Sequence, residues 1–283
     1  FITTFMLHPL AASAAPITFN TALPVGQEEW VLRQQFIYGQ GDGGNKSAEA
    51  LRSVSVLGYG ITPDFTLFGV VPFMHRDMDV GGGANRDATG VSDTQLIGRL
   101  TAFKDDFTGG TFRISPFFGV ELPTGENNKQ DSTGKLPPSL QPGSGSVDAL
   151  GGVVASYASF NLNMDAQLYW QGNNEADSIE RGDIFKADVS IQPRLLPQEI
   201  AAQTRGFLYG ALELNLEHQN KTQTLGVADT NSGGTKFFVT PGLHYTTKRW
   251  MAEMAVQIPV TQSVGGTNIE NDYRIFTGVR VNF

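Results

Sequence analysis

The chain contains no cysteine among its 283 residues and only four histidines. Without cysteine it forms no disulfide, has no thiolate chemistry and lacks the commonest zinc ligand. After residue 14 it also lacks a continuous apolar run of about 20 residues, the length that an α-helix needs to cross a membrane. The formal charge of −8 and the absence of a basic stripe argue against a nucleic-acid surface.

The N-terminus reads "FITTFMLHPLAASAAPITF". An apolar stretch from Phe1 to Leu10 is followed by small residues at an A-x-A spacing, which is typical of a secretory signal cleaved after Ala14. We therefore expect residues 1–14 to be a signal-peptide remnant and residues 15–283 to form one domain. The alternative is a short N-terminal segment that is buried in the fold.

The dominant hydrophobic pattern has a period of two, which indicates strands rather than helices. In "FNLNMDAQLYW", which starts at Phe160, apolar and polar side chains alternate almost without exception. Most segments of this kind have roughly the 9–11 residues of a tilted membrane-spanning strand. About twelve segments lie near 28–39, 48–62, 65–77, 91–103, 111–122, 146–158, 160–172, 183–195, 206–219, 235–246, 249–261 and 271–283. The second and third alternate poorly, and their facing is open.

The connections between these segments alternate in length. Short turns such as "TPDF" and "TTKR" take turns with long loops such as "DMDVGGGANRDATG" and "PTGENNKQDSTGKLPPSLQPGSG". Transmembrane barrels have short periplasmic turns and long extracellular loops. A backbone in lipid leaves no donor unpaired, so the last strand must pair with the first. This closure would bring Arg33 near Arg274 or Arg280, with a carboxylate or water between them.

An apolar stripe faces inward in a soluble sandwich or small barrel, but outward in an outer-membrane barrel. Twelve strands enclose more volume than apolar side chains fill, whereas about eight strands do not. Aromatic side chains also lie near the ends of the stripes, at the level of lipid headgroups. The sequence therefore predicts an all-β fold, a single antiparallel up-and-down barrel of about twelve strands in the bacterial outer membrane. The expected aromatic girdle comprises Trp30, Trp170, Trp250, Tyr273 and Phe283.

A final strand that ends in Phe283 after alternating apolar residues resembles the assembly signal of bacterial outer-membrane proteins. The stretches "LGYGITPDFTLFGVVPF", "SDTQLIGRL" and "FFGVELPTGENN" resemble the outer-membrane family named for the MetA-pathway of phenol degradation. The resemblance covers most of the barrel. The family resemblance implies the passage of aromatic or hydrophobic compounds, and the resemblance of the last strand to an assembly signal implies recognition of Phe283 by the barrel-assembly machinery.

The polar positions of the alternation place charged side chains in the lumen. They form either a paired network that stiffens the barrel or a charged constriction that selects solutes. The predicted pore-lining residues are Arg33, Arg99, Arg113, Glu121, Lys186, Asp188, Glu213, Glu217, Arg274 and Arg280. Arg113 and Glu121 are the candidates for a constriction. We further expect the loop from Pro123 to Gly145 to fold inward as a plug. Near the outer mouth, Phe238, Tyr169 and Tyr209 should form an apolar patch.

Catalytic and metal sites have little support. His75, His218 and His244 are isolated, His8 lies in the predicted signal, and no serine occurs in a G-x-S-x-G context. The acidic loops match no EF-hand, so we predict no catalytic residue, no metal and no cofactor. A hydrolase is the least favoured function.

The favoured function is a channel for passive uptake of small molecules. The alternative is a structural barrel or the membrane sleeve of a partner complex. Expected partners are lipid, lipopolysaccharide, the assembly machinery and a small solute, but no nucleic acid. The sequence leaves the oligomeric state open.

Overall fold

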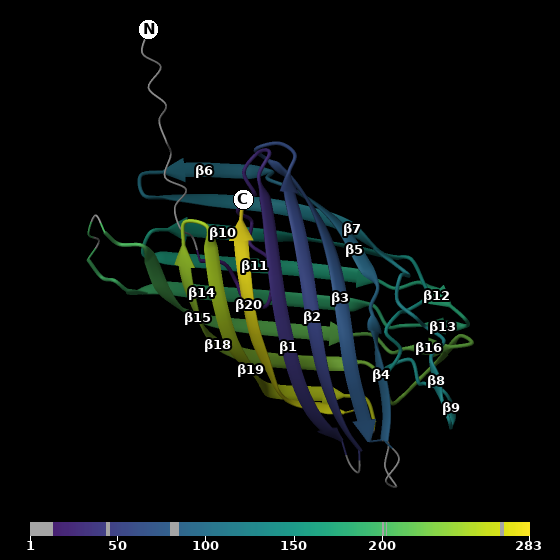
Figure 1. Cartoon of the computed structure of the whole chain (residues 1–283). Coiled ribbons are helices and arrows are strands. Elements are labelled where there is room, and N and C mark those ends of the chain that lie inside the picture. The colour runs from purple at the N-terminus through teal and green to yellow at the C-terminus, as the bar shows by residue number, and fades with distance from the viewer. Residues whose placement is uncertain (1–13, 44–45, 80–84, 200, 202, 267–268) are drawn as a thin grey trace.

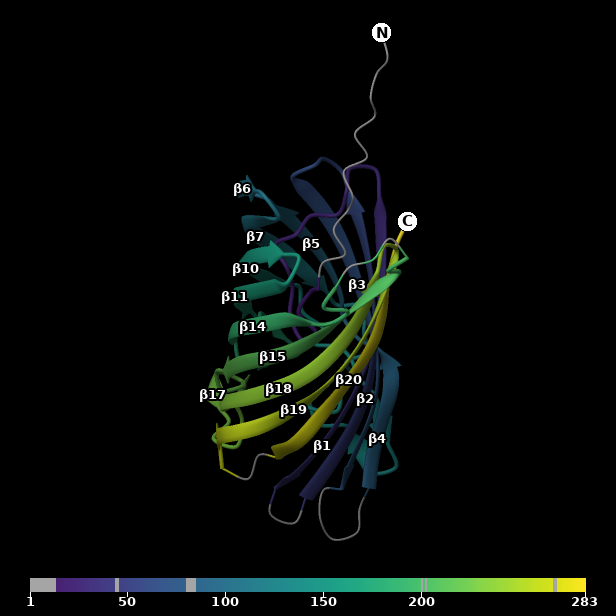
Figure 2. The same cartoon turned by 90° about the vertical axis from the view of Figure 1, so that its left-hand side faces the viewer.

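Twelve antiparallel strands close into a barrel in the computed structural model, which describes residues 14–43, 46–79, 85–199, 201, 203–266 and 269–283. Neighbours in the chain are neighbours in the wall, and the strands wrap around one interior (Figures 1 and 2). The wall consists of β1 (Trp30–Gly43), β2 (Lys46–Gly60), β3 (Phe65–Asp79), β4 (Asn85–Val91) continued by β5 (Thr94–Leu100), β7 (Gly110–Leu122), β10 (Asp148–Ser159), β11 (Leu162–Gly172), β14 (Ile184–Leu196), β15 (Gly206–Gln219), β18 (Gly234–Thr247), β19 (Trp250–Val264) and β20 (Glu270–Asn282). This confirms the predicted fold class.

The barrel closes between its first and last strands. β20 pairs with β1 from Val31↔Asn282 onward, and Arg33 stands directly opposite Arg280, as the sequence predicted. Trp30 and Phe283 extend the ladder, because each backbone N–H donates to the carbonyl of the other, at 2.7 and 2.9 Å. The terminal residue is therefore part of the closed wall. Closure pairs the first and last strands with each other, and among the described strands of this sheet β4 and β6 have a single neighbour each, β3 and β7.

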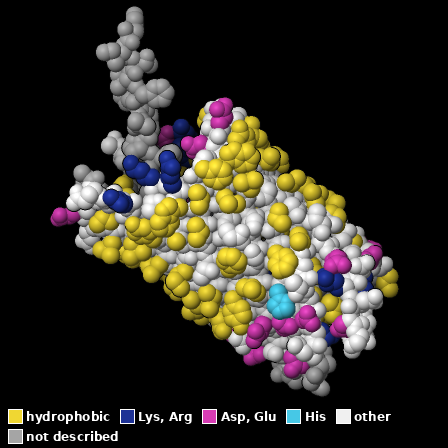
Figure 3. Space-filling model, viewed as in Figure 1, with side chains coloured by type: hydrophobic (Ala, Val, Ile, Leu, Met, Phe, Trp, Pro, Cys, Tyr) yellow, Lys and Arg dark blue, Asp and Glu magenta, His cyan; other side chains and the backbone are white. Residues whose placement is uncertain are grey.

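The burial pattern is the reverse of that of a soluble protein. Large apolar side chains such as Leu168 and Phe118 are exposed on the outer wall, at 50 % and 65 %. Polar side chains such as Gln192 and Glu213, both 0 % exposed, are buried inside. Figure 3 shows the apolar side chains spread over the wall and the charged ones gathered toward its two ends. An apolar exterior around a polar interior is what a lipid-facing barrel requires.

In the described part of the chain, no helix is long and apolar enough to cross a membrane.

The two ends of the barrel differ in the length of their connections, as the sequence predicts. The periplasmic end carries short turns and β6 (Phe103–Phe107), which pairs with the start of β7. The extracellular end carries small hairpins. One of them joins β8 (Gln130–Asp131) to β9 (Gly134–Lys135). The loops between β11 and β14 and between β15 and β18 form a second sheet of β12 (Glu175–Ala176), β13 (Ile179–Glu180), β16 (Gln223–Thr224) and β17 (Val227–Ala228).

Candidate functional site

Residues 14–25 lie inside the lumen, in contact with the inner faces of the wall strands. We call them the lumen segment. Ala14, Ile17 and Ala22 are at most 1 % exposed. Ile17 packs against Ala255 and Phe276 from the wall. The predicted signal remnant, residues 1–14, lies outside the described residues except for Ala14, so the choice between a signal and a buried N-terminal segment stays a prediction.

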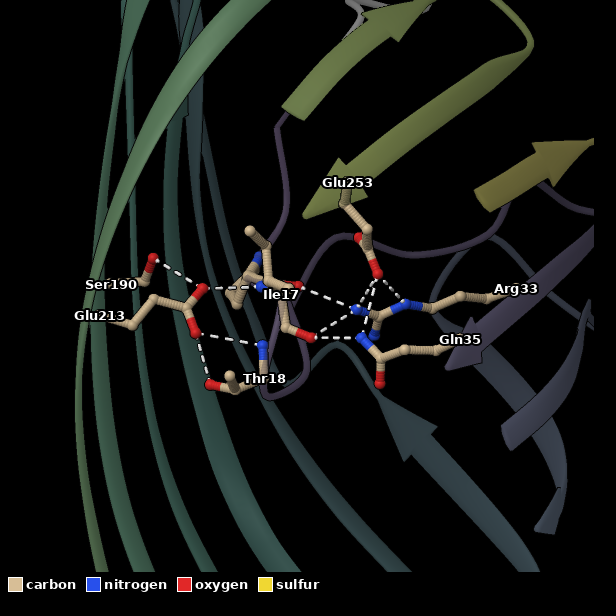
Figure 4. A network of polar contacts seen from close by, with 8 residues as sticks. Ile17, Thr18, Arg33, Gln35, Ser190, Glu213 and Glu253 are labelled. Atoms are coloured by element: carbon tan, nitrogen blue, oxygen red, sulfur yellow. Dashed lines mark hydrogen bonds and ion pairs between the residues drawn. The ribbon is translucent and has the colours of Figure 1, made fainter. Parts of the chain in front are cut away.

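Glu213 of β15 anchors the start of the lumen segment (Figure 4). Its carboxylate accepts hydrogen bonds from the Ile17 N–H at 2.7 Å and from the Thr18 N–H at 3.1 Å. The Thr18 hydroxyl also donates to it, and Ser190 Oγ lies at 3.4 Å. A charged acceptor that is buried needs such donors to offset the loss of water. The lumen segment supplies most of them.

A second anchor lies on the opposite side, around the Ile17 carbonyl (Figure 4). Arg33 Nη2 and Gln35 Nε2 donate to this oxygen at 2.6 and 2.8 Å. Both side chains also donate to Glu253 Oε1, with Arg33 Nη2 at 2.6 Å. Glu253 is on β19 and reaches over β20 at Gly278, where an added Cβ would lie 2.7 Å from its Oε1. Glu253 thus gives Arg33 a carboxylate partner where Arg33 faces Arg280, while the buried Arg280 Nε has no hydrogen-bond partner among the described residues.

The third anchor holds the next turn of the lumen segment. Arg99 donates to the carbonyls of Thr21 and Leu23, the latter at 2.7 Å. Ser156 Oγ accepts the Ala22 N–H at 2.7 Å. The segment therefore bridges several strands through hydrogen bonds. It leaves a cavity of about 60 Å³ in the periplasmic half of the lumen, lined in part by Phe19, Arg99 and Arg280.

After the lumen segment, the chain passes Gly60 of β2 before it enters the wall as β1. Here Gln27 makes a bridge to Gly60, and the Glu28 N–H donates to its carbonyl at 2.8 Å. A Cβ on Gly60 would lie 2.0 Å from the Gly26 carbonyl oxygen. Only glycine allows this close passage of the two backbones.

The extracellular half of the lumen is lined by a different set of charges. Arg52 of β2 lies opposite Ile37 on the inner side of the wall and is exposed there. It makes no hydrogen bond or ion pair with another described residue. Arg76 donates only to the Ser139 carbonyl among the described residues. Arg274 lies 3.5 Å from Glu217. This side of the lumen thus presents cations with few carboxylate partners.

Carboxylates on the other side of the extracellular half are held by loops and amides. Asp93 accepts from the Gly125 N–H at 2.9 Å and from Ser144 Oγ at 2.8 Å, which ties the long loop to the break between β4 and β5. Glu121 accepts from Gln95 at 2.6 Å. Asp148 accepts the Asn174 N–H at 2.8 Å. These acids act as structural acceptors.

Comparison of the sequence with models of protein families identifies the family of this chain. A family model described as "Putative MetA-pathway of phenol degradation" matches residues 34–270. The chain belongs to this family. A search of curated proteins found no sequence that matches this chain.

Solved structures with a fold similar to this family member include an outer membrane channel and the beta domain of an autotransporter. The COG4313 outer membrane channel from Pseudomonas putida F1 has a TM-score of 0.71 and 16 % identity, over 95 % of this chain and 100 % of that one. The beta domain of the Bordetella autotransporter BrkA has a TM-score of 0.52 and 9 % identity, over 91 % of this chain and 100 % of that one. At these identities the likeness concerns the fold.

The ten predicted pore-lining residues of this MetA-pathway family member fall into three groups. Arg33, Arg99 and Glu213 bind the lumen segment, and Arg280 lines the small cavity beside it. Glu121, Lys186, Asp188, Glu217 and Arg274 lie in the extracellular half: Lys186 is 5.6 Å from the Tyr169 ring, and Asp188 accepts from Asn215 at 2.9 Å. Arg113 lies at the periplasmic end, 3.4 Å from Asp106 of β6.

Two expectations about the lumen, the shared constriction and the apolar patch, need correction. Arg113 and Glu121 lie at opposite ends of β7 and form no common constriction. The loop from Pro123 to Gly145 does fold over the outer mouth, where Leu136 and Leu140 pack on Ala88, but the periplasmic half is filled by the lumen segment.

The predicted apolar patch does not form as one group either. Tyr209 is near the periplasmic end, where its hydroxyl donates to the Phe160 carbonyl at 3.2 Å. Phe238 lies instead beneath Arg274, 4.9 Å from ring centre to guanidinium. Tyr169 stacks on Phe117, with ring centroids 6.2 Å apart.

The predicted girdle residues lie on the outer wall near the two ends. At the periplasmic end, Trp30 lies against Tyr59 with centroids 4.5 Å apart, and Trp250 and Phe283 are 43 % and 64 % exposed. Trp170 and Tyr273 lie toward the extracellular end. Exposed rings at both levels suit the two lipid interfaces.

The three histidines in the described part of the chain lie apart from one another. His75 contacts Thr89 Oγ1 at 2.6 Å and Asp77 at 2.8 Å on the outer face of the wall. His218 contacts Thr235 at 2.8 Å, and His244 is buried beside Tyr209. No group of three or more metal-ligating side chains occurs in the part of the chain that the structure describes.

Proposed function

We propose that this protein is a passive outer-membrane channel whose conduction depends on release of the lumen segment. The observation that carries the proposal is the filling of the lumen. Residues 14–25 occupy the periplasmic half through hydrogen bonds to strand side chains. A soluble barrel of this class would instead fill its interior with packed apolar side chains. A segment held mainly by polar contacts can leave and return more easily than an apolar core can open, although the small apolar clusters around Ile17 and Ala22 would separate as it leaves.

The polar wall behind the segment supports a water-filled path. Once the segment leaves, Glu213, Arg33 and Arg99 would face water rather than backbone groups, which keeps their solvation cost low. The extracellular half already presents exposed Arg52. We expect this half to set ion preference, because unpaired cations attract anions within a narrow low-dielectric passage.

For the solute, the family description supports small aromatic or hydrophobic compounds. Tyr169 is partly exposed on the inner wall near the cations, and Phe117, which packs on it and belongs to the cluster around Ala22, would be uncovered when the segment leaves. We propose that solutes pass along this mixed surface. The assignment of Phe283 to the assembly machinery also remains a proposal.

Planar-bilayer recordings and liposome swelling test the channel directly. The wild type should show small or rare conducting events, and deletion of residues 15–25 should give larger or longer ones. If neither protein conducts and neither supports solute-dependent swelling, the barrel is a structural component and the proposal fails.

A further inference from the structure

A cavity of about 280 Å³ lies among the extracellular loops, outside the lumen segment. It is enclosed by the loop between β7 and β10 on one side and by the β12–β13 hairpin on the other. Its apolar wall consists of Leu136, Pro137, Pro138, Ala176 and Ile179. The volume is just below the range of about 300–1,000 Å³ typical of pockets for drug-sized ligands, so it suits a smaller molecule.

Arg181 supplies the main charge of this cavity. Its Nη2 donates to the carbonyls of Pro138 and Gly143, at 3.2 and 2.6 Å. Its Nε and Nη1 have no hydrogen-bond partner among the described residues, and no carboxylate there pairs with it. Burial lowers the pKa of Arg181, while the more distant Asp93, Glu121 and Asp148 oppose this effect. Because a guanidinium keeps its charge in proteins, it remains a partly buried cation with free donors.

The second charged pair at the cavity does not cancel this cation. Lys135 Nζ lies 3.7 Å from Asp177, and both side chains are about half exposed, at 49 % and 59 %. Asp177 also accepts from Asn127 Nδ2 at 3.1 Å. With Asp177 committed to these two partners, the lining has one more cation than anion. Arg181 has no carboxylate in contact among the described residues, only the more distant Asp93, Glu121 and Asp148, so an anion that enters the cavity and contacts it is stabilised.

We propose that this cavity binds a small organic anion, a monocarboxylate with an apolar body, at the outer mouth of the barrel. The carboxylate accepts from the free Nε–H and Nη1–H of Arg181, and the apolar body lies against Leu136, Pro137 and Ile179. Its role as a capture site for uptake rests on the proposed channel function. Arg181 lies within electrostatic range of Arg52 and Arg76, so the captured anion would next meet the exposed cations of the lumen.

Equilibrium binding to the purified full-length barrel tests this site, with benzoate as the probe. Cyclohexanecarboxylate keeps the charge and an apolar body, acetate lacks the body, and benzyl alcohol lacks the charge. We expect the first two to bind, and acetate and benzyl alcohol to bind at least about tenfold more weakly, since a charge-assisted pair and an apolar ring each change affinity by that order.

Variants locate the binding on the protein. Arg181→Gln should weaken benzoate binding roughly tenfold to a hundredfold, and Arg181→Lys should retain more of it. Because Arg181 also holds two loop carbonyls, Ile179→Trp provides a second variant, which fills the cavity and leaves the cation in place. Arg249→Gln, at the exposed periplasmic turn, is the matched control and should bind as the wild type does. Heat-modifiable gel migration checks that each variant is folded.

The proposal is overturned if the wild type does not bind benzoate at millimolar concentration, if benzyl alcohol or acetate binds equally well, or if both cavity variants bind as the wild type does. Wild-type conductance is measured separately and tests the channel function. A barrel that conducts without binding benzoate refutes the capture site alone. A barrel that binds benzoate without conducting refutes the channel alone.

Discussion

The Glu213 carboxylate offers the sharpest test of the lumen segment, because it touches the segment at three donors and is fully buried. Glu213→Gln keeps the size of the side chain but leaves one carbonyl oxygen. That oxygen can keep the Ile17 N–H. The new amide group would then face the two Thr18 donors, which lose their acceptor.

The size of the effect follows from those two hydrogen bonds. Each hydrogen bond to a charged group contributes about 1.5–3 kcal/mol. The variant therefore weakens the attachment of the lumen segment at this anchor by about 3–6 kcal/mol. The ratio of released to held segment should rise roughly a hundredfold to ten-thousandfold. Arg33, Gln35 and Arg99 still hold the segment. We therefore expect more frequent openings rather than a permanently open pore.

Single-channel recording in planar bilayers measures this change as the frequency of openings. Glu217→Gln is the matched control, since Glu217 is on the same strand and contacts Arg274 rather than the segment. It should leave the opening frequency near the wild-type value. The reasoning fails if Glu213→Gln opens no more often than the wild type while deletion of residues 15–25 does increase conduction, because the anchor would then carry no holding free energy.

Three further predictions concern other parts of the barrel. Arg52→Gln should lower the preference for chloride over potassium in reversal-potential measurements, and an unchanged potential would show that this cation does not face the ion path. Gly60→Ala should destabilise the barrel by about 1–3 kcal/mol in thermal unfolding, because the added Cβ meets the Gly26 carbonyl. The control Gly69→Ala should not destabilise it, since the nearest atom to the added Cβ is 4.0 Å away. Equal destabilisation by the two variants would contradict the clash. Deleting Phe283 should reduce the amount of folded barrel in outer membranes, whereas Arg280→Gln should leave that amount unchanged. A normal amount of folded barrel without Phe283 would show that the terminal pairing is not required for assembly.

The alternation of the sequence was sufficient to predict the barrel where both faces keep their character. It left the facing of the second segment open for a local reason. Gln34, Ser53 and Ser55 are polar yet lie on the outer face, where Gln34 Nε2 donates to Ser53 at 2.8 Å and Ser55 donates back to Gln34 at 2.6 Å. Val56 faces inward. Polar groups that satisfy one another can face lipid, and no period reveals such a group in advance.

The candidate site was less predictable, because its parts come from distant positions. Residues 14–25 have no strand period, and their burial depends on Glu213, almost two hundred residues further along the chain. The alternation predicts which charges face inward but not how deep they lie in the barrel, so it offered Arg113 and Glu121 as candidates for a constriction although they lie at opposite ends of β7. The cavity at Arg181 forms only when two loops meet above the mouth. Sequence spacing carries no record of that contact.

The lumen segment also has a mechanical consequence. A single sheet rolled into a tube can flatten under lateral pressure from the lipid, because nothing inside opposes the change. Here Ile17 and Thr18 connect β15 to β1, and Thr21 and Ala22 connect β5 to β10. The segment therefore cross-links separate parts of the wall through the interior of the barrel. The occupied barrel should keep a rounder and stiffer cross-section than the empty one. Membrane tension would then bear on the pore through its shape, even where no solute is present.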